Sequence, residues 1–199
     1  SKLKTPAFAK ASVDKQISKI ETESLEIRAK ILGEAYAFGA QKFETDKNAK
    51  EEIISINNKI YKKDSGVMEV WKKGKQWSLD YFEILYRRLG IKYDKYYFES
   101  ETGVEGLKIV KENSPRVFEK DDGALIFRGE KLGLHTRVFV TKDDYATYEG
   151  KDLGLAILKN KDYPDADSLI MTANEQTEYF KVMLAALKLF DSKIAGKTN

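Results

Sequence analysis

The chain has 199 residues, of which 42% are hydrophobic and 34% charged, and this composition is that of a globular protein. Its net charge of +3 does not by itself indicate a nucleic-acid-binding protein, so RNA contacts would need local clustering of basic residues. The absence of cysteine excludes disulfides and Cys-ligated metal sites, and no apolar run approaches the ~20 residues of a membrane span. These features are compatible with a cytoplasmic protein.

The N-terminal part is predicted to contain two charged amphipathic helices over residues 12–63. Apolar residues recur at roughly helical spacing from Ile17 to Phe43, and Asp46 begins a second helix whose isoleucines share one face. Charge runs of this kind are usually solvated faces. The alternative is a free-standing RNA-binding or assembly module, which clustering of seven lysines on one face would favour: Lys30, Lys42, Lys47, Lys50, Lys59, Lys62 and Lys63.

A third helix is predicted from Val67 to Leu89, after a turn at Asp64-Ser65-Gly66. Gly90 then suits a left-handed C-cap. The helix carries aromatic residues at helical spacing, which is more typical of a core than of an RNA-stacking surface. We therefore predict a helical segment over residues 1–90.

The character of the sequence changes at Ile91. An aromatic-rich strand is predicted from Tyr93 to Phe98. A helix running to about Asn113 follows, and Ser100 or Thr102 is a candidate to cap it.

A β-hairpin is predicted next. Residues 116–120 and 124–128 flank Asp121-Asp122-Gly123, which is a strong hairpin signal. Residues 137–141 form a further predicted strand. His135, the one histidine of the chain, precedes it, and a lone histidine in this position is more often structural or exposed than catalytic.

The stretch from Thr147 to Gln176 is predicted to contain a helix, a loop, a buried strand at 167–173 and the first turn of a second helix. Asn174 is the expected N-cap of that second helix. We expect the strands at 93–98 and 167–173 to be parallel neighbours in a mixed sheet.

Three polar side chains of this stretch form the candidate binding site. Tyr148 and Asp152 lie four residues apart and share one helix face, and Gln176 follows the predicted strand. In an open α/β sheet, ligands bind beyond the carboxyl ends of the strands. An aromatic ring, a carboxylate and an amide would converge there, in a pocket suited to a small cationic ligand. The alternative is that Tyr148 packs, Asp152 pairs with Lys151 or Lys159, and Gln176 caps its helix.

The chain carries two spaced segments, Thr147-Tyr148-Glu149-Gly150-Lys151-Asp152-Leu153-Gly154-Leu155-Ala156 and Asn174-Glu175-Gln176-Thr177-Glu178-Tyr179-Phe180. Together they resemble the catalytic domain of arginyl-tRNA synthetase, which has a Thr-Tyr-x-x-(Arg/Lys)-Asp-(Leu/Ile) segment and, one strand later, a Gln-x-x-(His/Tyr)-Phe segment. The resemblance implies that Tyr148, Asp152 and Gln176 contact L-arginine and that Tyr179 lies near the adenosine of ATP.

The sequence departs from the family pattern at three places. Asp143-Asp144-Tyr145 stands where the family commonly has Asp-Gly-Thr, so the turn before the helix is expected to differ. Lys151 stands where Arg is frequent, which keeps the charge but loses the bidentate fork. Tyr179 stands where His is frequent.

The resemblance also implies the reaction of the whole enzyme, which joins L-arginine to its tRNA through arginyl-adenylate and uses ATP and Mg²⁺. The class I signature His-Ile-Gly-His needs two histidines, and the chain has one. A Lys-Met-Ser-Lys-Ser loop is also missing from the sequence. Those two segments stabilise the ATP phosphates. We therefore expect an internal fragment that binds neither ATP nor Mg²⁺ and does not activate arginine alone.

The expected fold class is mixed α/β: a helical segment at 1–90 and a partial class I synthetase Rossmann-type sheet with an inserted antiparallel hairpin at 91–199. A sheet without its first strands would expose an edge and an apolar face, so self-association of the fragment is expected. A non-enzymatic arginine-binding domain that keeps only the amino-acid pocket is a second alternative function.

Overall fold

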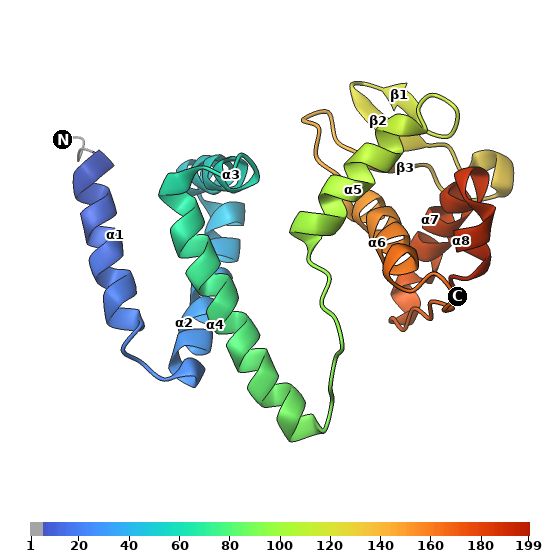
Figure 1. The fold of residues 1–199 in the computed structure, drawn as a ribbon. Helices are drawn as coiled ribbons and strands as arrows, with labels where there is room; N and C mark the ends of the chain where they lie inside the picture. The colour runs from blue at the N-terminus through green and yellow to red at the C-terminus, as the bar shows by residue number, and fades with distance from the viewer. Residues whose placement is uncertain (1–5) are drawn as a thin grey trace. The chain divides into compact units, whose positions relative to one another are not determined.

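The computed structural model describes residues 6–199, with side chains described from residue 13 onward. Its contacts divide the chain into two compact units, Ser1–Tyr93 and Asp94–Asn199. The first unit is helical, and the second combines helices with a small sheet (Figure 1). Among the helices of the described part, none is both long and apolar enough to cross a membrane.

The first unit consists of helices α1 (Pro6–Ile20), α2 (Leu25–Thr45), α3 (Lys47–Tyr61) and α4 (Ser65–Leu89). The single helix predicted from Ile17 to Phe43 is therefore wrong, because the chain breaks between α1 and α2. The Ser24 hydroxyl accepts the N–H of Ile27 at 3.3 Å and begins α2. The guanidinium of Arg28 donates to the carbonyls before it, which holds the break in place.

The other helix ends of this unit lie close to where the sequence predicts them. Asp46 caps α3 by accepting the N–H groups of Asn48 and Ala49. Gly90 ends α4 in the left-handed conformation, with φ of 69°. The predicted turn at Asp64-Ser65-Gly66 is instead the start of α4, with Asp64 as its N-cap.

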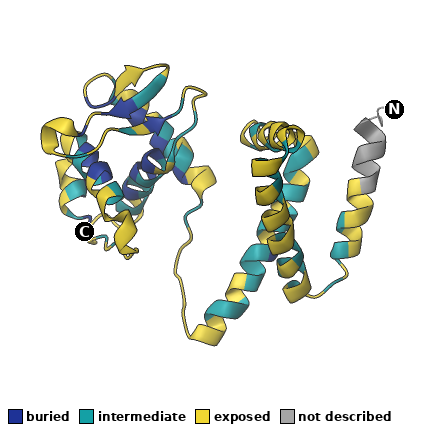
Figure 2. Ribbon diagram, turned by 180° about the vertical axis from the view of Figure 1, so that it is seen from behind, coloured by how far each residue is buried: buried dark blue, intermediate teal, exposed yellow. Residues whose placement is uncertain are grey.

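The first unit has little core of its own. Among its described side chains, only Trp77 is buried, and Figure 2 shows α2, α3 and α4 mostly exposed or half-buried. The core role predicted for the α4 aromatics holds for Trp77, whereas Phe82 is 44% exposed. Arg28 covers Trp77, with its guanidinium carbon 5.7 Å from the ring centroid.

The second unit carries the hydrophobic core. Its helices are α5 (Glu99–Glu112), α6 (Tyr148–Asp162), α7 (Thr177–Phe190) and α8 (Ser192–Gly196), with short 3₁₀ turns η1 (Glu130–Leu132) and η2 (Asn174–Gln176). Fully buried side chains from the hairpin region, α6 and α7 pack together: Phe118, Phe139, Leu153, Met183 and Leu187. The rings of Phe118 and Phe139 lie 4.9 Å apart at the centre of this core.

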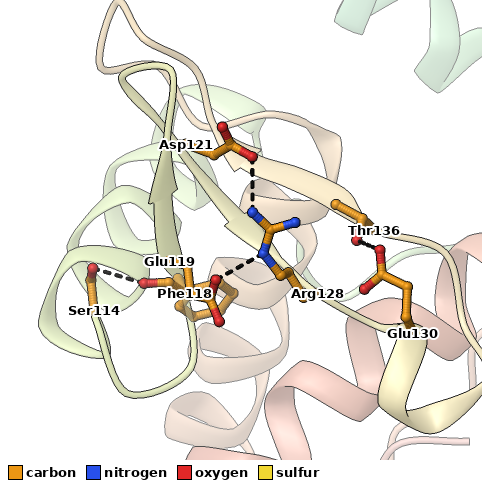
Figure 3. Close-up of polar contacts among 7 residues, drawn as sticks. All are labelled: Ser114, Phe118, Glu119, Asp121, Arg128, Glu130 and Thr136. Carbon is orange, nitrogen blue, oxygen red and sulfur yellow. Dashed lines mark hydrogen bonds and ion pairs between the residues drawn. The ribbon is translucent and has the colours of Figure 1, made fainter.

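Three antiparallel strands form the sheet of the described residues, in the order β1 (Glu119–Asp121), β2 (Ala124–Phe127) and β3 (Arg137–Val140). The predicted hairpin is confirmed, but its loop is the two residues Asp122 and Gly123, with φ of 43° and 83°, because Asp121 belongs to β1. Arg128 reaches from the end of β2 to the carboxylates of Glu119 at 2.8 Å and Asp121 at 3.0 Å (Figure 3).

The mixed α/β class is confirmed, but the two strands expected at 93–98 and 167–173 do not form ladders. Residues 168–170 are extended and pair with the backbone of residues 197–199 in one parallel bridge. The backbone N–H of Ser168 donates to the Lys197 carbonyl at 2.7 Å, and the backbone N–H of Asn199 donates to the Ser168 carbonyl at 2.8 Å. A parallel strand pairs with a strand that is distant in sequence, and among the described residues the segment at 167–173 finds only the short pairing with residues 197–199.

Candidate functional site

Helix α6 carries two of the predicted site residues, and backbone packing fixes its position. A Cβ on Gly154 would lie 2.1 Å from the carbonyl oxygen of Thr102 on α5. A Cβ on Gly150 would lie 2.5 Å from the carbonyl oxygen of Phe139 on β3. Because glycine alone permits these distances, α6 approaches both α5 and β3 at backbone contact. The side chains that α6 presents are therefore held on a rigid element.

The first residue of the Thr-Tyr pair anchors the start of α6. The Thr147 backbone N–H and hydroxyl both bond to the Phe139 carbonyl, and the hydroxyl also lies 2.7 Å from the Val138 carbonyl. The same hydroxyl oxygen caps the helix by accepting the N–H of Gly150 at 3.5 Å. This threonine therefore sets where the following tyrosine and aspartate project.

Tyr148 is 68% exposed and does not pack into the core. The Lys151 ammonium lies 5.0 Å from the centroid of its ring, which is a cation–π contact. Lys151 also pairs with Glu99 at the start of α5, at 2.6 Å. One face of the Tyr148 ring is thus covered by Lys151, whose ammonium group is held by the Glu99 carboxylate.

Asp152 is half-buried, and its Oδ2 accepts a hydrogen bond from the hydroxyl of Tyr179 on α7. Burial raises the pKa of the Asp152 carboxyl above its ordinary value, whereas the bond from Tyr179 lowers it. Nearby Glu149 and Glu99 raise this pKa further, and Lys151 lowers it. Burial and the Asp152 charge raise the pKa of Tyr179 as well, so its hydroxyl stays a donor at neutral pH.

The two lysines considered as surface partners of Asp152 both make contacts with other residues. Lys151 pairs with Glu99, and Lys159 donates to the Ser168 hydroxyl at 2.5 Å. Asp152 and Lys159 instead line a cavity of about 130 Å³ between α6, α7 and residues 168–170, together with Leu155, Ala156, Ser168, Ile170, Phe180, Met183 and Thr198.

Gln176 and Asn174 sit differently from what the sequence predicts. Both belong to η2, and Gln176 instead of Asn174 occupies the N-cap position of α7, where its side chain makes no capping hydrogen bond. The Gln176 side-chain oxygen accepts a hydrogen bond from the Thr172 hydroxyl. Gln176 and Tyr148 are exposed and do not line the cavity that Asp152 borders. Ser100 and Thr102 likewise do not cap α5, whose N-cap is Phe98.

Two features near Asp152 carry no recognisable signal in the sequence. Glu149 is buried and pairs with Arg137 of β3 at 3.4 Å. The bond between Asp152 and Tyr179 joins residues 27 positions apart. Only the tertiary arrangement of β3, α6 and α7 reveals these pairs. His135 is exposed, as the sequence predicts.

The residues present do not form a metal centre. Within residues 6–199 as described, no three His, Cys, Asp or Glu side chains gather in a way that could hold a metal ion.

Residues 10–195 match the family model described as tRNA synthetases class I (R), catalytic domain. The chain belongs to this family. The arginine–tRNA ligase of Flavobacterium psychrophilum is 34% identical over 153 residues, which cover 72% of this chain and 26% of that protein. The arginine–tRNA ligase of Treponema denticola is 36% identical over 121 residues, which cover 60% of this chain and 20% of that protein.

The fold agrees with this family. A solved structure from Campylobacter jejuni, described as an arginyl-tRNA synthetase, superimposes with a TM-score of 0.55 and 17% identity, over 75% of this chain and 35% of that one. The class I synthetase chain described here thus spans about a quarter of the length of the curated relatives it matches.

Proposed function

We propose that this chain is the part of an arginine–tRNA ligase that supplies one side of the L-arginine pocket. In this proposal Asp152 binds the guanidinium, Tyr148 stacks on it or accepts from it, and Gln176 holds the polar end of the amino acid or a ribose. The observation that carries the proposal is a half-buried Asp152 carboxylate at a cavity wall, on a helix fixed by backbone contacts.

The chemistry of Asp152 suits a guanidinium. A carboxylate offers two oxygens that match the planar fork of guanidinium donors, and a bidentate pair of this kind is stronger than a neutral hydrogen bond. The Lys151 ammonium pairs with Glu99 and the Lys159 ammonium bonds to the Ser168 hydroxyl, while the Lys151 charge also lowers the pKa of Asp152. A ligand guanidinium would add positive charge beside a carboxylate whose ionisation burial opposes.

The remaining parts of the reaction belong to the whole enzyme in this proposal. ATP and Mg²⁺ supply the activation of arginine, and the tRNA accepts the arginyl group. The two sequence signatures that hold ATP are missing from this chain, so by itself it binds neither cofactor and forms no arginyl-adenylate. The contact of Tyr179 with adenosine stays a prediction, as do a cytoplasmic location and the functional division at 1–90 and 91–199.

The RNA-binding alternative has less support from the described residues. Lys30 pairs with Glu34 and Lys42 with Asp46, so acidic side chains interrupt the lysines that would have to form one basic face. An arginine-binding domain without chemistry uses the same pocket, and it is separated from a ligase only by assays on a longer protein.

L-arginine titration followed by amide chemical shifts tests the proposal. We expect arginine to shift the amides around the Asp152 cavity, and Asp152→Asn to weaken binding by about tenfold or more, since hydrogen bonds to charged groups contribute roughly 1.5–3 kcal/mol. Asp162→Asn at the other end of α6 is the matched control and should bind arginine as the unmodified chain does. L-citrulline, which lacks the positive charge, should not bind.

Two outcomes would contradict this function for the chain. One is equal arginine affinity in the Asp152→Asn and unmodified chains. The other is the absence of arginine-dependent shifts at saturating concentration, which would assign arginine recognition to residues outside this chain.

A further inference from the structure

Tyr179 lies in the first turn of α7, and its hydroxyl points at Asp152 across the boundary between two helices. The ring is itself held, because it packs edge-on against Phe180 with centroids 4.9 Å apart at an angle of 90°. Phe180 lines the same cavity as Asp152. The tyrosine hydroxyl is therefore placed by the packing of α7.

This contact restricts the carboxylate of Asp152 without closing it to a ligand. An aspartate on a helix rotates about its terminal torsion over a broad range when nothing holds it. A bond to Oδ2 fixes the plane of the carboxylate. Each carboxylate oxygen has two acceptor positions, so Tyr179 uses one of about four and the others remain usable by a bidentate guanidinium.

The charged side chains around Asp152 and Tyr179 affect how readily the Asp152 carboxyl ionises. Acidic side chains of α5 and α6 oppose ionisation of Asp152, and cationic ones of α6 and β3 lie close to the pair. The charged groups that face it are Glu99, Glu149, Lys151, Lys159 and Arg137. Burial also favours the neutral acid, whereas the hydrogen bond that the Tyr179 hydroxyl donates to the carboxylate favours the ionised form.

We propose that Tyr179 is a positioning residue for arginine recognition, whose hydroxyl orients the Asp152 carboxylate and keeps it ionised for the guanidinium. This inference rests on the proposed function of Asp152. It assigns the tyrosine hydroxyl to the amino-acid side of the site. It also gives a physical role to the tyrosine at a position where the family frequently has histidine: a tyrosine hydroxyl donates throughout the neutral pH range, whereas a histidine changes charge near pH 6.5.

The first test needs no ligand. The carboxyl carbon resonance of Asp152 is followed by NMR as the pH is varied, in the unmodified chain and in Tyr179→Phe. Loss of the hydroxyl removes a contact that favours the carboxylate, so we expect the Asp152 titration midpoint to move to higher pH. Tyr179→His, which restores an N–H donor, should return the midpoint to the original value or below it.

Tyr97→Phe is the matched control. Tyr97 donates to Asp162 at 2.7 Å at the other end of α6, so this variant should raise the titration midpoint of Asp162 and leave that of Asp152 unchanged. Circular dichroism on all variants checks that each is folded. An Asp152 midpoint that does not move in Tyr179→Phe would overturn the proposal.

The second test uses L-arginine. Tyr179→Phe should weaken arginine binding by about three- to tenfold, the size of one lost hydrogen bond. The loss should be larger at pH 5 than at pH 8, because more Asp152 is protonated at the lower pH. A purely structural role of Tyr179 would weaken binding equally at both pH values, and that result would also overturn the proposal.

The two hypotheses fail separately. If Asp152→Asn leaves arginine affinity unchanged, the proposed function of the pocket fails. If Asp152→Asn weakens binding while Tyr179→Phe changes neither the affinity nor the midpoint, only the role of Tyr179 fails.

Discussion

Gly106 on α5 lies so close to Gly150 on α6 that a Cβ on Gly106 would fall 1.8 Å from the Gly150 carbonyl oxygen. Real side chains do not approach backbone this closely, so the two helices cannot keep their positions if Gly106 gains a methyl group. The same helix pair positions the start of α6 and hence Tyr148 and Asp152.

Gly106→Ala should therefore destabilise the second unit by about 3 kcal/mol or more, as overpacking does where backbone cannot move away. Gly103→Ala on the same helix is the control, because its Cβ would lie at an ordinary 3.6 Å from the Lys151 side chain. That variant should be neutral or more stable by about 0.4–1 kcal/mol. Urea unfolding followed by circular dichroism measures both, and equal stabilities would refute the backbone-contact explanation.

The ion pair between Arg137 and Glu149 is a second test of the packing around α6. Glu149 is buried, so Arg137→Met leaves a carboxylate without its cation, and we expect a loss of about 1–2 kcal/mol in the free energy of unfolding. Arg128→Met removes an exposed cation that bridges Glu119 and Asp121 (Figure 3). Its loss should stay below about 1 kcal/mol. Similar losses in the two variants would contradict the importance of burial at Glu149.

The raised pKa of Asp152 predicts a pH-dependent gain in stability when the charge is removed. An acid whose pKa is higher in the folded than in the unfolded state loses stability as the pH rises from about 4, its ordinary value, through the folded pKa. Asp152→Asn should thus be more stable than the unmodified chain at pH 7, by less than about 1 kcal/mol because solvent partly screens the site. The difference should vanish below pH 4.

Asp162→Asn should change the stability at pH 7 in the opposite direction to Asp152→Asn, and it serves as the control. Lys95 and Tyr97 lower the pKa of Asp162, so its carboxylate stabilises the fold above about pH 4 and this stabilisation is lost as the pH falls through the folded pKa. The variant should be less stable than the unmodified chain at pH 7 and equal to it in strong acid. Thermal unfolding across this pH range compares the two variants.

Self-association is expected from the extended segment after α6. Leu169 is 71% exposed and Met171 is 89% exposed. The backbone of residues 168–170 pairs along one edge with residues 197–199, and exposed apolar side chains beside such a segment favour association. Sedimentation velocity should show a mass above 22.7 kDa that grows with concentration. Leu169→Ser with Met171→Ser should reduce this growth, whereas Val104→Ser, which removes an isolated exposed apolar residue on α5, should not. A concentration-independent monomer would contradict the prediction.

Local chemistry made several elements predictable from the sequence. Asp46 and Gly90 bound helices because a capping carboxylate and a left-handed glycine act within a few residues of their own positions. Asp122 and Gly123 turn the hairpin for the same reason. The spaced segments around Tyr148 and Gln176 carried the family, which the match over residues 10–195 confirms.

Only the tertiary structure showed which predicted strands pair and where the N-terminal helices break, because both depend on contacts with other residues. The stretches at 93–98 and 167–173 have the composition of strands, but a strand forms a ladder only beside another strand, and the described residues offer one short parallel bridge. The break at Ser24 depended on Arg28 bonding to carbonyls behind it.

The sequence by itself determined the family, the helix ends at Asp46 and Gly90 and the hairpin turn, because each depends on residues close together along the chain. The role of Asp152 in binding stays a prediction. Only the tertiary structure placed Tyr179 on Asp152, Arg137 on Glu149 and the backbone of α5 on α6. Those contacts join residues on different elements, and their distances follow from how the core packs and not from sequence spacing.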